Sequence, residues 1–210
     1  MKKGIFITFE GNDGAGKTSV CKKVLEQLMT EDYDVLYTRE PGGSAIAEGI
    51  RNILLDTEHT NMDPRAEALL YAASRAQHLS EVILPALEKK QIVLCDRFID
   101  SSLAYQGYAR GLGMDEVWAI NQFAVDRCMP DKTIFLSVST HTGRIRMNRR
   151  GDKNRLDLEK GFFHQKVREG YEKIVEKYPE RICVIDAEPA LDQVVEATMK
   201  VIKEVIADYE

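Results

Sequence analysis

The chain lacks a long hydrophobic run, paired cysteines and an excess of positive charge. A helix needs about 20 consecutive apolar residues to span a bilayer, and no stretch of this sequence approaches that length. The cysteines stand singly, with no C-x-x-C pair, which indicates small core residues in a reducing compartment and argues against a disulfide framework or a zinc site. They are Cys21, Cys95, Cys128 and Cys183. These absences predict a cytoplasmic protein.

The formal net charge is −5, which argues against general nucleic-acid binding, because nucleic-acid-binding proteins usually carry a net basic face. Local clusters of Arg and Lys must therefore meet any polyanionic substrate. The 210 residues contain no repeat, low-complexity tract or linker rich in Pro and Ser. The sequence predicts one domain over residues 1–210, large enough to bury a substantial core.

The most informative motif begins at Gly11 and ends at Thr18, directly after the apolar stretch 5–9. It matches G-x-x-x-x-G-K-[ST], in which glycines let several backbone N–H groups point at one phosphate. Lys17 would reach the outer phosphates, and the Thr18 hydroxyl would hold Mg²⁺. The motif predicts binding of a nucleoside triphosphate; the alternative is a glycine-rich turn before an ordinary helix. The predicted triphosphate-binding residues are Gly11, Asn12, Asp13, Gly14, Ala15, Gly16, Lys17, Thr18 and Ser19.

Apolar runs of strand length alternate with longer helical patterns. The predicted strands are 4–9, 34–38, 91–95, 132–137 and 181–185. The predicted helices are 16–31, 44–55, 64–89, 115–127, 140–149, 158–177 and 191–207. This alternation predicts an α/β fold with a five-stranded parallel sheet covered by helices on both faces. Ligands of such folds bind beyond the carboxyl ends of the strands.

The predicted strand near 91–95 is followed by Asp96 and Arg97. A carboxylate at a strand tip beside the phosphate loop can orient Mg²⁺ or its waters, so Thr18 and Asp96 are the candidate metal residues. The neighbouring guanidinium could take a phosphate bidentately. The alternative is that Asp96 serves only the chemistry of a turn.

A shaped turn follows the predicted strand near 34–38, with the sequence Arg39-Glu-Pro-Gly-Gly43. Proline fixes the chain and the two glycines permit positive φ. Arg39 could meet a phosphate, and Glu40 could hold that arginine or a metal-bound water. The alternative is an exposed turn with a surface ion pair.

On the predicted helix 64–89, Tyr71, Arg75 and His78 lie at i, i+4 and i+7 and share one face. A ring and a guanidinium on one stripe suit a nucleobase, although tyrosine at helical spacing is more often part of the core. We expect Pro85 to end or kink this helix near its carboxyl end.

Two further segments carry polar chemistry. Ser102, Tyr105 and Gln106 can share a face around a small polar ligand, or they can form a capping turn with a half-buried tyrosine. Five arginines crowd residues 144–155, with glycine inside the run, which suggests a mobile lid that closes positive charge over phosphates. The alternative is an exposed basic helix end.

Taken together, these segments resemble the thymidylate kinase family, which phosphorylates dTMP with ATP. The resemblance rests on the phosphate loop, on Thr38-Arg-Glu-Pro-Gly-Gly43 and on Tyr71-Ala-Ala-Ser-Arg75. It also rests on Asp96-Arg97 followed by Ser101-Ser-Leu-Ala-Tyr-Gln-Gly107 and on the arginine-rich segment. It implies a P-loop NTPase-type three-layer sandwich, Mg²⁺ with ATP, a homodimer and a lid near 144–157.

The resemblance also implies how dTMP would be bound. Asp13 would contact the 3′-hydroxyl group, and Arg39 and Arg97 the phosphate. Tyr105 would crowd the 2′ position and so favour deoxyribose.

For the thymine base, the resemblance implies that Tyr71 stacks on the ring and that Arg75 contacts a base carbonyl. Ser102 and Gln106 would read the base edge and the sugar.

The phosphate loop has no arginine between its glycines, which is similar to the family branch that supplies a catalytic arginine from the lid. Arg149, Arg150 and Arg155 are the candidates, beside Lys17 and Arg97 as catalytic residues. The family usually reads Asp-Arg-apolar-Glu in the lid, whereas this chain reads Asn-Arg-Leu-Asp at 154–157.

Three rival functions stay open at this point. A regulatory GTPase needs an Asn-Lys-x-Asp guanine motif, which is absent. Another nucleoside-monophosphate kinase or a deoxynucleoside kinase would differ in its acceptor, and a nucleoside kinase would need a general base. A binding module without turnover would release no ADP with any acceptor.

Overall fold

The computed structural model describes residues 4–148, 154–159 and 161–209, and these residues contain a parallel sheet of five strands. The strands are β1 (Ile5–Glu10), β2 (Val35–Arg39), β3 (Ile92–Asp96), β4 (Lys132–Ser137) and β5 (Ile182–Asp186). Their spatial order is β2-β3-β1-β4-β5, and every neighbouring pair is parallel. The predicted fold class is therefore confirmed, and each predicted strand lies within one residue of the observed one.

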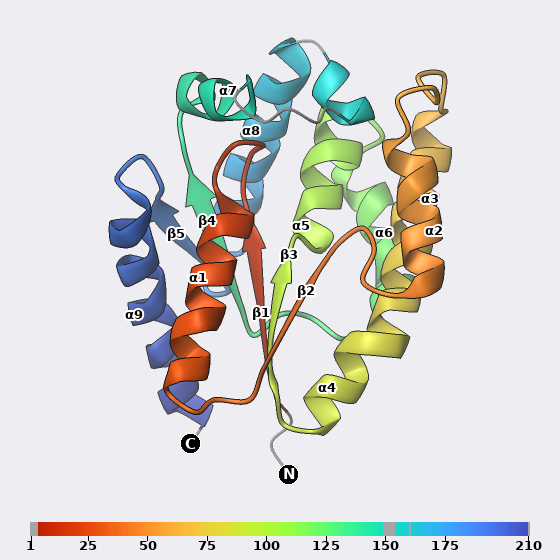
Figure 1. Cartoon of the computed structure of the whole chain (residues 1–210). Helices are drawn as coiled ribbons and strands as arrows, with labels where there is room; N and C mark the ends of the chain where they lie inside the picture. Colours follow the sequence, from red (N-terminus) through yellow and green to blue (C-terminus); the bar gives the residue numbers. More distant parts are fainter. Residues whose placement is uncertain (1–3, 149–153, 160, 210) are drawn as a thin grey trace.

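Helices cover both faces of the sheet because successive side chains of a strand point to opposite faces, and both sets are apolar. Ile5, Ile7 and Phe9 of β1 pack with α1 (Lys17–Thr30) and α9 (Leu191–Tyr209). Figure 1 shows these two helices side by side on one side of the sheet. Phe6 points the other way, into a cluster that includes α8 (Gly161–Lys177).

The remaining helical elements lie between the strands along the chain. The α-helices are α2 (Ala45–Leu55), α3 (Pro64–His78), α4 (Leu84–Glu88), α5 (Ile99–Ser102), α6 (Met114–Val125) and α7 (Thr140–Asn148). Two π-helical segments, η1 (Leu79–Ile83) and η2 (Leu103–Ala109), and one 3₁₀ turn, η3 (Arg155–Leu158), complete the described elements. None of the helices in the described part of the chain is both long enough and apolar enough to cross a membrane.

Two helical predictions need correction. The predicted helix 64–89 continues through Pro85, but its turns widen to the π form over Leu79–Ile83, directly before the proline. Proline lacks an N–H and its ring crowds the preceding turn, so a widened turn at this point fits the sequence. The helical segment from Ile99 to Ala109 is absent from the prediction, because its serines and Gly107 favour a turn by propensity alone.

All five described strands point in one direction, so their carboxyl ends meet at one edge of the sheet. In Figure 1 this edge lies toward the top, near α7. Glu10, Arg39 and Asp96 stand at the ends of three adjacent strands there. This edge is where ligands bind in open parallel sheets.

Candidate active site

A cavity of about 490 Å³ lies at the carboxyl edge of the sheet. Its size is typical of a small-molecule site. It brings together segments that are far apart in the sequence: the phosphate loop, the ends of β2 and β3, α2, α3 and η2. The predicted site residues that line it are Asp13, Gly14, Gly16, Lys17, Thr18, Ser19, Arg39, Tyr71, Asp96, Arg97, Ser102, Tyr105 and Gln106.

The phosphate loop connects β1 to α1 through backbone conformations that require glycine. Gly16 caps α1 with φ of 89°, in the left-handed region. A Cβ on Gly11 would lie 2.5 Å from the carbonyl oxygen of Leu136, closer than any side chain tolerates. The loop therefore delivers the amino end of a 14-residue helix to the cavity, where its free N–H groups and dipole favour an anion.

Backbone carbonyl groups of the phosphate loop hold the Lys17 side chain in place. Its Nζ donates to the carbonyl oxygens of Gly11 and Asn12, each at 2.9 Å. Burial, followed by the charge of Arg97, lowers the pKa of Lys17 to about 8. The ammonium group is therefore charged at neutral pH, and it lies beside the loop N–H groups that suit a phosphate.

Thr18 and Asp96 meet across the ends of α1 and β3. The Thr18 hydroxyl donates a hydrogen bond to the Asp96 carboxylate. Among the described residues, no group of three or more His, Cys, Asp or Glu side chains gathers as a metal site. A hydroxyl and one carboxylate nevertheless suit Mg²⁺, which binds few protein ligands and keeps waters and phosphate oxygens.

Arg97 joins the phosphate loop to the far side of the cavity. Its φ is 71°, a conformation that is uncommon outside glycine and is maintained only where surrounding contacts impose it. One end of its guanidinium pairs with Asp13 of the loop. Its Nη1 donates to Ser101 Oγ at 3.0 Å and to the Gly11 carbonyl oxygen at 3.3 Å. The group also lies 5.2 Å from the centre of the Tyr105 ring.

The strained segment at Arg97 is stabilised by Glu10, a residue that sequence reasoning missed. The buried Glu10 carboxylate accepts hydrogen bonds from the backbone N–H groups of Phe98 and Ser101, at 2.7 and 3.1 Å. It also accepts from Ser101 Oγ at 2.6 Å and from the Tyr171 hydroxyl at 2.8 Å. Burial, followed by the charge of Asp100, raises the pKa of Glu10. The sequence does contain a pattern that could have identified Glu10. It is an acidic residue at the end of an apolar strand, as Asp96 is.

Asp13 is bound from two sides. Besides its ion pair with Arg97, it accepts a hydrogen bond of 2.7 Å from the Tyr105 hydroxyl. Burial opposes ionisation of Asp13, but the charges of Arg97 and Lys17 outweigh it and lower the pKa to about 2. Asp13 is thus an ionised acceptor at neutral pH.

Two arginines, one at the end of β2 and one on α2, donate to the same carbonyl group in the turn after β2. Arg39 and Arg51 both donate to the carbonyl oxygen of Pro41 at 2.8 Å, and Arg39 also pairs with Glu48 at 3.0 Å. Arg51 lines the cavity and is missing from the sequence prediction. It shares a helix face with the buried Ala47, four residues earlier, and an arginine on an apolar face is the signal that could have revealed it.

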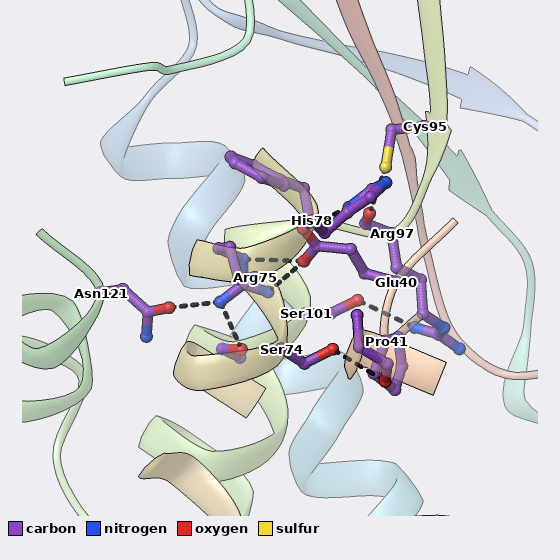
Figure 2. Close-up of polar contacts among 12 residues, drawn as sticks. Glu40, Pro41, Ser74, Arg75, His78, Cys95, Arg97, Ser101 and Asn121 are labelled. Atoms are coloured by element: carbon purple, nitrogen blue, oxygen red, sulfur yellow. Dashed lines mark hydrogen bonds and ion pairs between the residues drawn. The ribbon is translucent and has the colours of Figure 1, made fainter. Parts of the chain in front are cut away.

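Glu40 does not hold Arg39, which was one of the two roles predicted for it. It is buried and pairs with Arg75 at 2.8 Å and with His78 at 3.1 Å. Figure 2 shows Arg75 between this carboxylate and Asn121. Arg75 Nη1 also donates to Ser102 Oγ at 3.1 Å.

Arg75 does not line the cavity; it is 1% exposed and stands behind Ser102, which does. Its predicted direct contact with a base carbonyl stays a prediction.

The lid residues lie differently from the sequence prediction. Arg155 is buried, donates from Nε to the carbonyl oxygen of Leu54 at 2.8 Å, and pairs with Glu67 at 2.6 Å. It does not line the cavity, so here it holds η3 against α2 and α3 instead of reaching the phosphate loop. The Asn154 side chain, which replaces the usual acid, caps η3 together with Asp157. Arg149 and Arg150 lie outside the described residues.

Three predicted loop residues, Gly11, Asn12 and Ala15, also stand outside the cavity lining. Asn12 faces a second cavity of about 580 Å³, which shares Asp13 and Tyr105 with the first and reaches α7 and α8. Pro41, Leu55 and Leu156 also line the first cavity and are missing from the sequence prediction, whereas Arg146, another lining residue, belongs to the predicted arginine-rich segment.

The chain is similar to members of one enzyme family. A family model described as thymidylate kinase matches residues 9–198. The chain is 54% identical over 209 residues to the thymidylate kinase of Oceanobacillus iheyensis, covering 99% of this chain and 93% of that protein. It is 56% identical over 206 residues to that of Halalkalibacterium halodurans, covering 97% and 98%. The crystal structure of thymidylate kinase from Ehrlichia chaffeensis superposes with a TM-score of 0.77 at 34% identity, covering 96% and 99%.

The low pKa of Asp13 predicts a pH dependence of stability. Its folded pKa of about 2 lies below its ordinary value of 3.8, so the stabilisation is complete above pH 4–5 and disappears as the pH falls toward 2. The difference corresponds to about 2 kcal/mol, of which about 1 kcal/mol is lost by pH 3. Urea unfolding between pH 6 and pH 3 should show this loss, and Asp13→Asn should remove it.

Asp32→Asn, at an exposed turn, is the matched control and should keep the wild-type pH dependence. An Asp13→Asn variant whose stability falls with acid as steeply as wild type would contradict the ion pair as the cause.

Proposed function

The chain belongs to the thymidylate kinase family, and from this membership we propose how its residues carry out the family's reaction. The enzyme transfers the γ-phosphoryl group of ATP to dTMP, giving dTDP and ADP in dTTP biosynthesis.

ATP occupies the phosphate-loop side of the cavity in this proposal. Its phosphates accept hydrogen bonds from the loop N–H groups at the start of α1, and Lys17 neutralises the outer ones. The Thr18 hydroxyl would bind Mg²⁺ directly, and Asp96 would orient its waters. When bound, Mg²⁺ supplies neutralisation of phosphate charge.

dTMP occupies the side formed by β2, α3 and η2. Arg39 and Arg97 bind its phosphate, with Arg51 beside Arg39 on the same carbonyl group. Asp13 accepts from the 3′-hydroxyl group, and Tyr105, bonded to Asp13, crowds the 2′ position.

The thymine base stacks on Tyr71 in this proposal. Ser102 and Gln106 line the same part of the cavity and read the base edge, and Arg75 supports Ser102 from behind.

The observation that carries the proposal is the position of Arg97, between the phosphate loop and the acceptor side. The acceptor phosphate is already an anion near pH 7, since its second pKa is close to 6, so transfer needs no strong general base. The main obstacle is repulsion between two anions. A guanidinium fixed between them aligns the phosphates and stabilises the charge that spreads during transfer.

We extend the proposal to the whole chain: residues 1–210 form one nucleoside-monophosphate kinase domain with a lid near 144–157. Arg149 and Arg150 are the candidate catalytic arginines of this lid, while Arg155 anchors its end to Glu67. The protein is proposed to act in the cytoplasm; recovery from cells in a membrane or secreted fraction would contradict this.

ADP release from ATP should show the acceptor preference. With Mg²⁺ present, we expect turnover to favour dTMP strongly over dUMP, UMP and thymidine, and excess EDTA to abolish it. The same assay on Arg149→Ala and Arg150→Ala identifies the lid arginine whose loss lowers kcat by orders of magnitude. Turnover of thymidine in place of dTMP would contradict the phosphate site at Arg39 and Arg97, and full activity in EDTA would contradict the metal role of Thr18 and Asp96.

The family resemblance also supports a homodimer. Exposed apolar side chains stand on α3 and on the two helices that pack against it: Leu69 on α3, Ile46 and Ile53 on α2, and Phe123 on α6, the last 92% exposed. Light scattering should give twice the chain mass of 23.8 kDa. Leu69→Glu should shift the protein to monomer, whereas Phe162→Glu, on α8, should not. A wild-type monomer at micromolar concentration would contradict the dimer.

A further inference from the structure

Glu67 lies on α3 with no exposed surface, and it does not line the cavity. Three side chains nevertheless converge on its carboxylate. Oε1 accepts a hydrogen bond from Gln106 Nε2 at 2.8 Å, and Oε2 pairs with Arg155 at 2.6 Å. Arg110, which follows η2, donates to both oxygens, at 3.3 and 3.2 Å. One buried carboxylate thus joins α3, the end of the lid and a residue of the cavity wall.

The carboxylate is ionised at neutral pH. Burial opposes ionisation, but the charges of Arg110 and Arg155 and the hydrogen bond from Gln106 outweigh it and lower the pKa of Glu67. An ionised carboxylate has no proton to donate and only accepts hydrogen bonds. Each neighbour of Glu67 must therefore turn a hydrogen-bond donor toward it.

Gln106 is the neighbour for which the restriction matters. Its amide has an NH₂ end that donates and an oxygen that accepts. Because Glu67 accepts only, the NH₂ end must face Glu67, and the oxygen must face away from it. Gln106 is 2% exposed and lines the cavity, and its amide oxygen accepts no hydrogen bond within the described residues. That oxygen is therefore available to a ligand.

An oxygen fixed in this orientation selects among pyrimidine bases. Thymine carries a hydrogen on N3 and can donate it, whereas the cytosine N3 has only a lone pair and would face the oxygen with repulsion. A buried polar group that loses its partner in this way gives strong discrimination.

We propose that Glu67 is a specificity-determining positioning residue, whose carboxylate holds the Gln106 amide with its oxygen toward the base and so selects bases that carry an N3 hydrogen. The inference rests on the proposed place of Gln106 at the base edge. In addition, the residue that determines the choice of base does not itself line the cavity. It is Glu67, which contacts the lining residue Gln106 and also anchors Arg155.

The test compares dTMP with 5-methyl-dCMP, two acceptors that share the methyl group, the sugar and the phosphate. Glu67→Gln keeps the size of the side chain but can donate to the Gln106 oxygen, which frees that amide to turn. We expect the ratio of kcat/KM for dTMP over 5-methyl-dCMP to fall at least about tenfold. Glu159→Gln is the matched control, because Glu159 pairs with the same Arg110 without contacting Gln106, and its ratio should stay within about twofold of wild type.

Glu67→Gln could instead lower kcat/KM equally for both acceptors and leave the ratio unchanged. That result would mean that Glu67 only stabilises the fold, and it would overturn the proposal. If circular dichroism shows that Glu67→Gln does not fold, Glu67→Asp takes its place. It keeps the charge for both arginines but withdraws the carboxylate from Gln106, and an unchanged ratio would again overturn the proposal.

Gln106→Leu separates this inference from the proposed function. If that variant keeps the wild-type ratio, Gln106 does not read the base and the proposed base site is wrong. If the ratio falls in Gln106→Leu, adding Glu67→Gln should lower it no further, because Glu67 acts through the amide that has been removed.

Discussion

The site depends on a single guanidinium that spans it. Arg97 follows β3 in a left-handed backbone conformation, and this conformation lets its side chain reach both Asp13 of the phosphate loop and Ser101 of α5. The two substrates of a phosphoryl transfer are anions that repel each other, so an enzyme must fix positive charge between them. The backbone strain at Arg97 is the local cost of fixing the charge there. Three hydrogen bonds from Phe98 and Ser101 to Glu10 stabilise the segment that follows Arg97, and a fourth, from Tyr171, holds the Glu10 carboxylate in place.

Buried carboxylates support the residues that form the cavity. Three buried glutamates, Glu10, Glu40 and Glu67, hold residues around the cavity in place, and only Glu40 is itself part of the cavity lining. Glu40 holds Arg75, and Glu67 holds Gln106 and the end of the lid. A buried carboxylate is unfavourable without partners, so each one constrains its partners tightly. Glu40 lies at the cavity lining, whereas Glu10 and Glu67 lie behind it, so the cavity is shaped in part by charges outside its lining.

Local patterns were enough to predict the strands, the phosphate loop and most of the residues that line the cavity. Apolar runs identify strands buried on both faces, and G-x-x-x-x-G-K-[ST] requires a particular loop geometry. The pairings across the sequence were not predictable. Nothing near Arg155 indicates that its partner is Glu67, and nothing near Glu40 indicates that it holds Arg75 and not Arg39. Such pairs depend on tertiary packing between helices whose relative position one sequence does not encode locally.

The most direct measurement of the central claim is the single-turnover rate of dTMP phosphorylation by Arg97→Lys, together with the affinity of that variant for ATP. A lysine keeps the positive charge but loses the planar fork that contacts Asp13 and Ser101 together. We expect a transfer rate lower by about 10³-fold, with ATP affinity changed no more than a few-fold. A transfer rate close to wild type would contradict the claim that the guanidinium of Arg97 joins the two halves of the site.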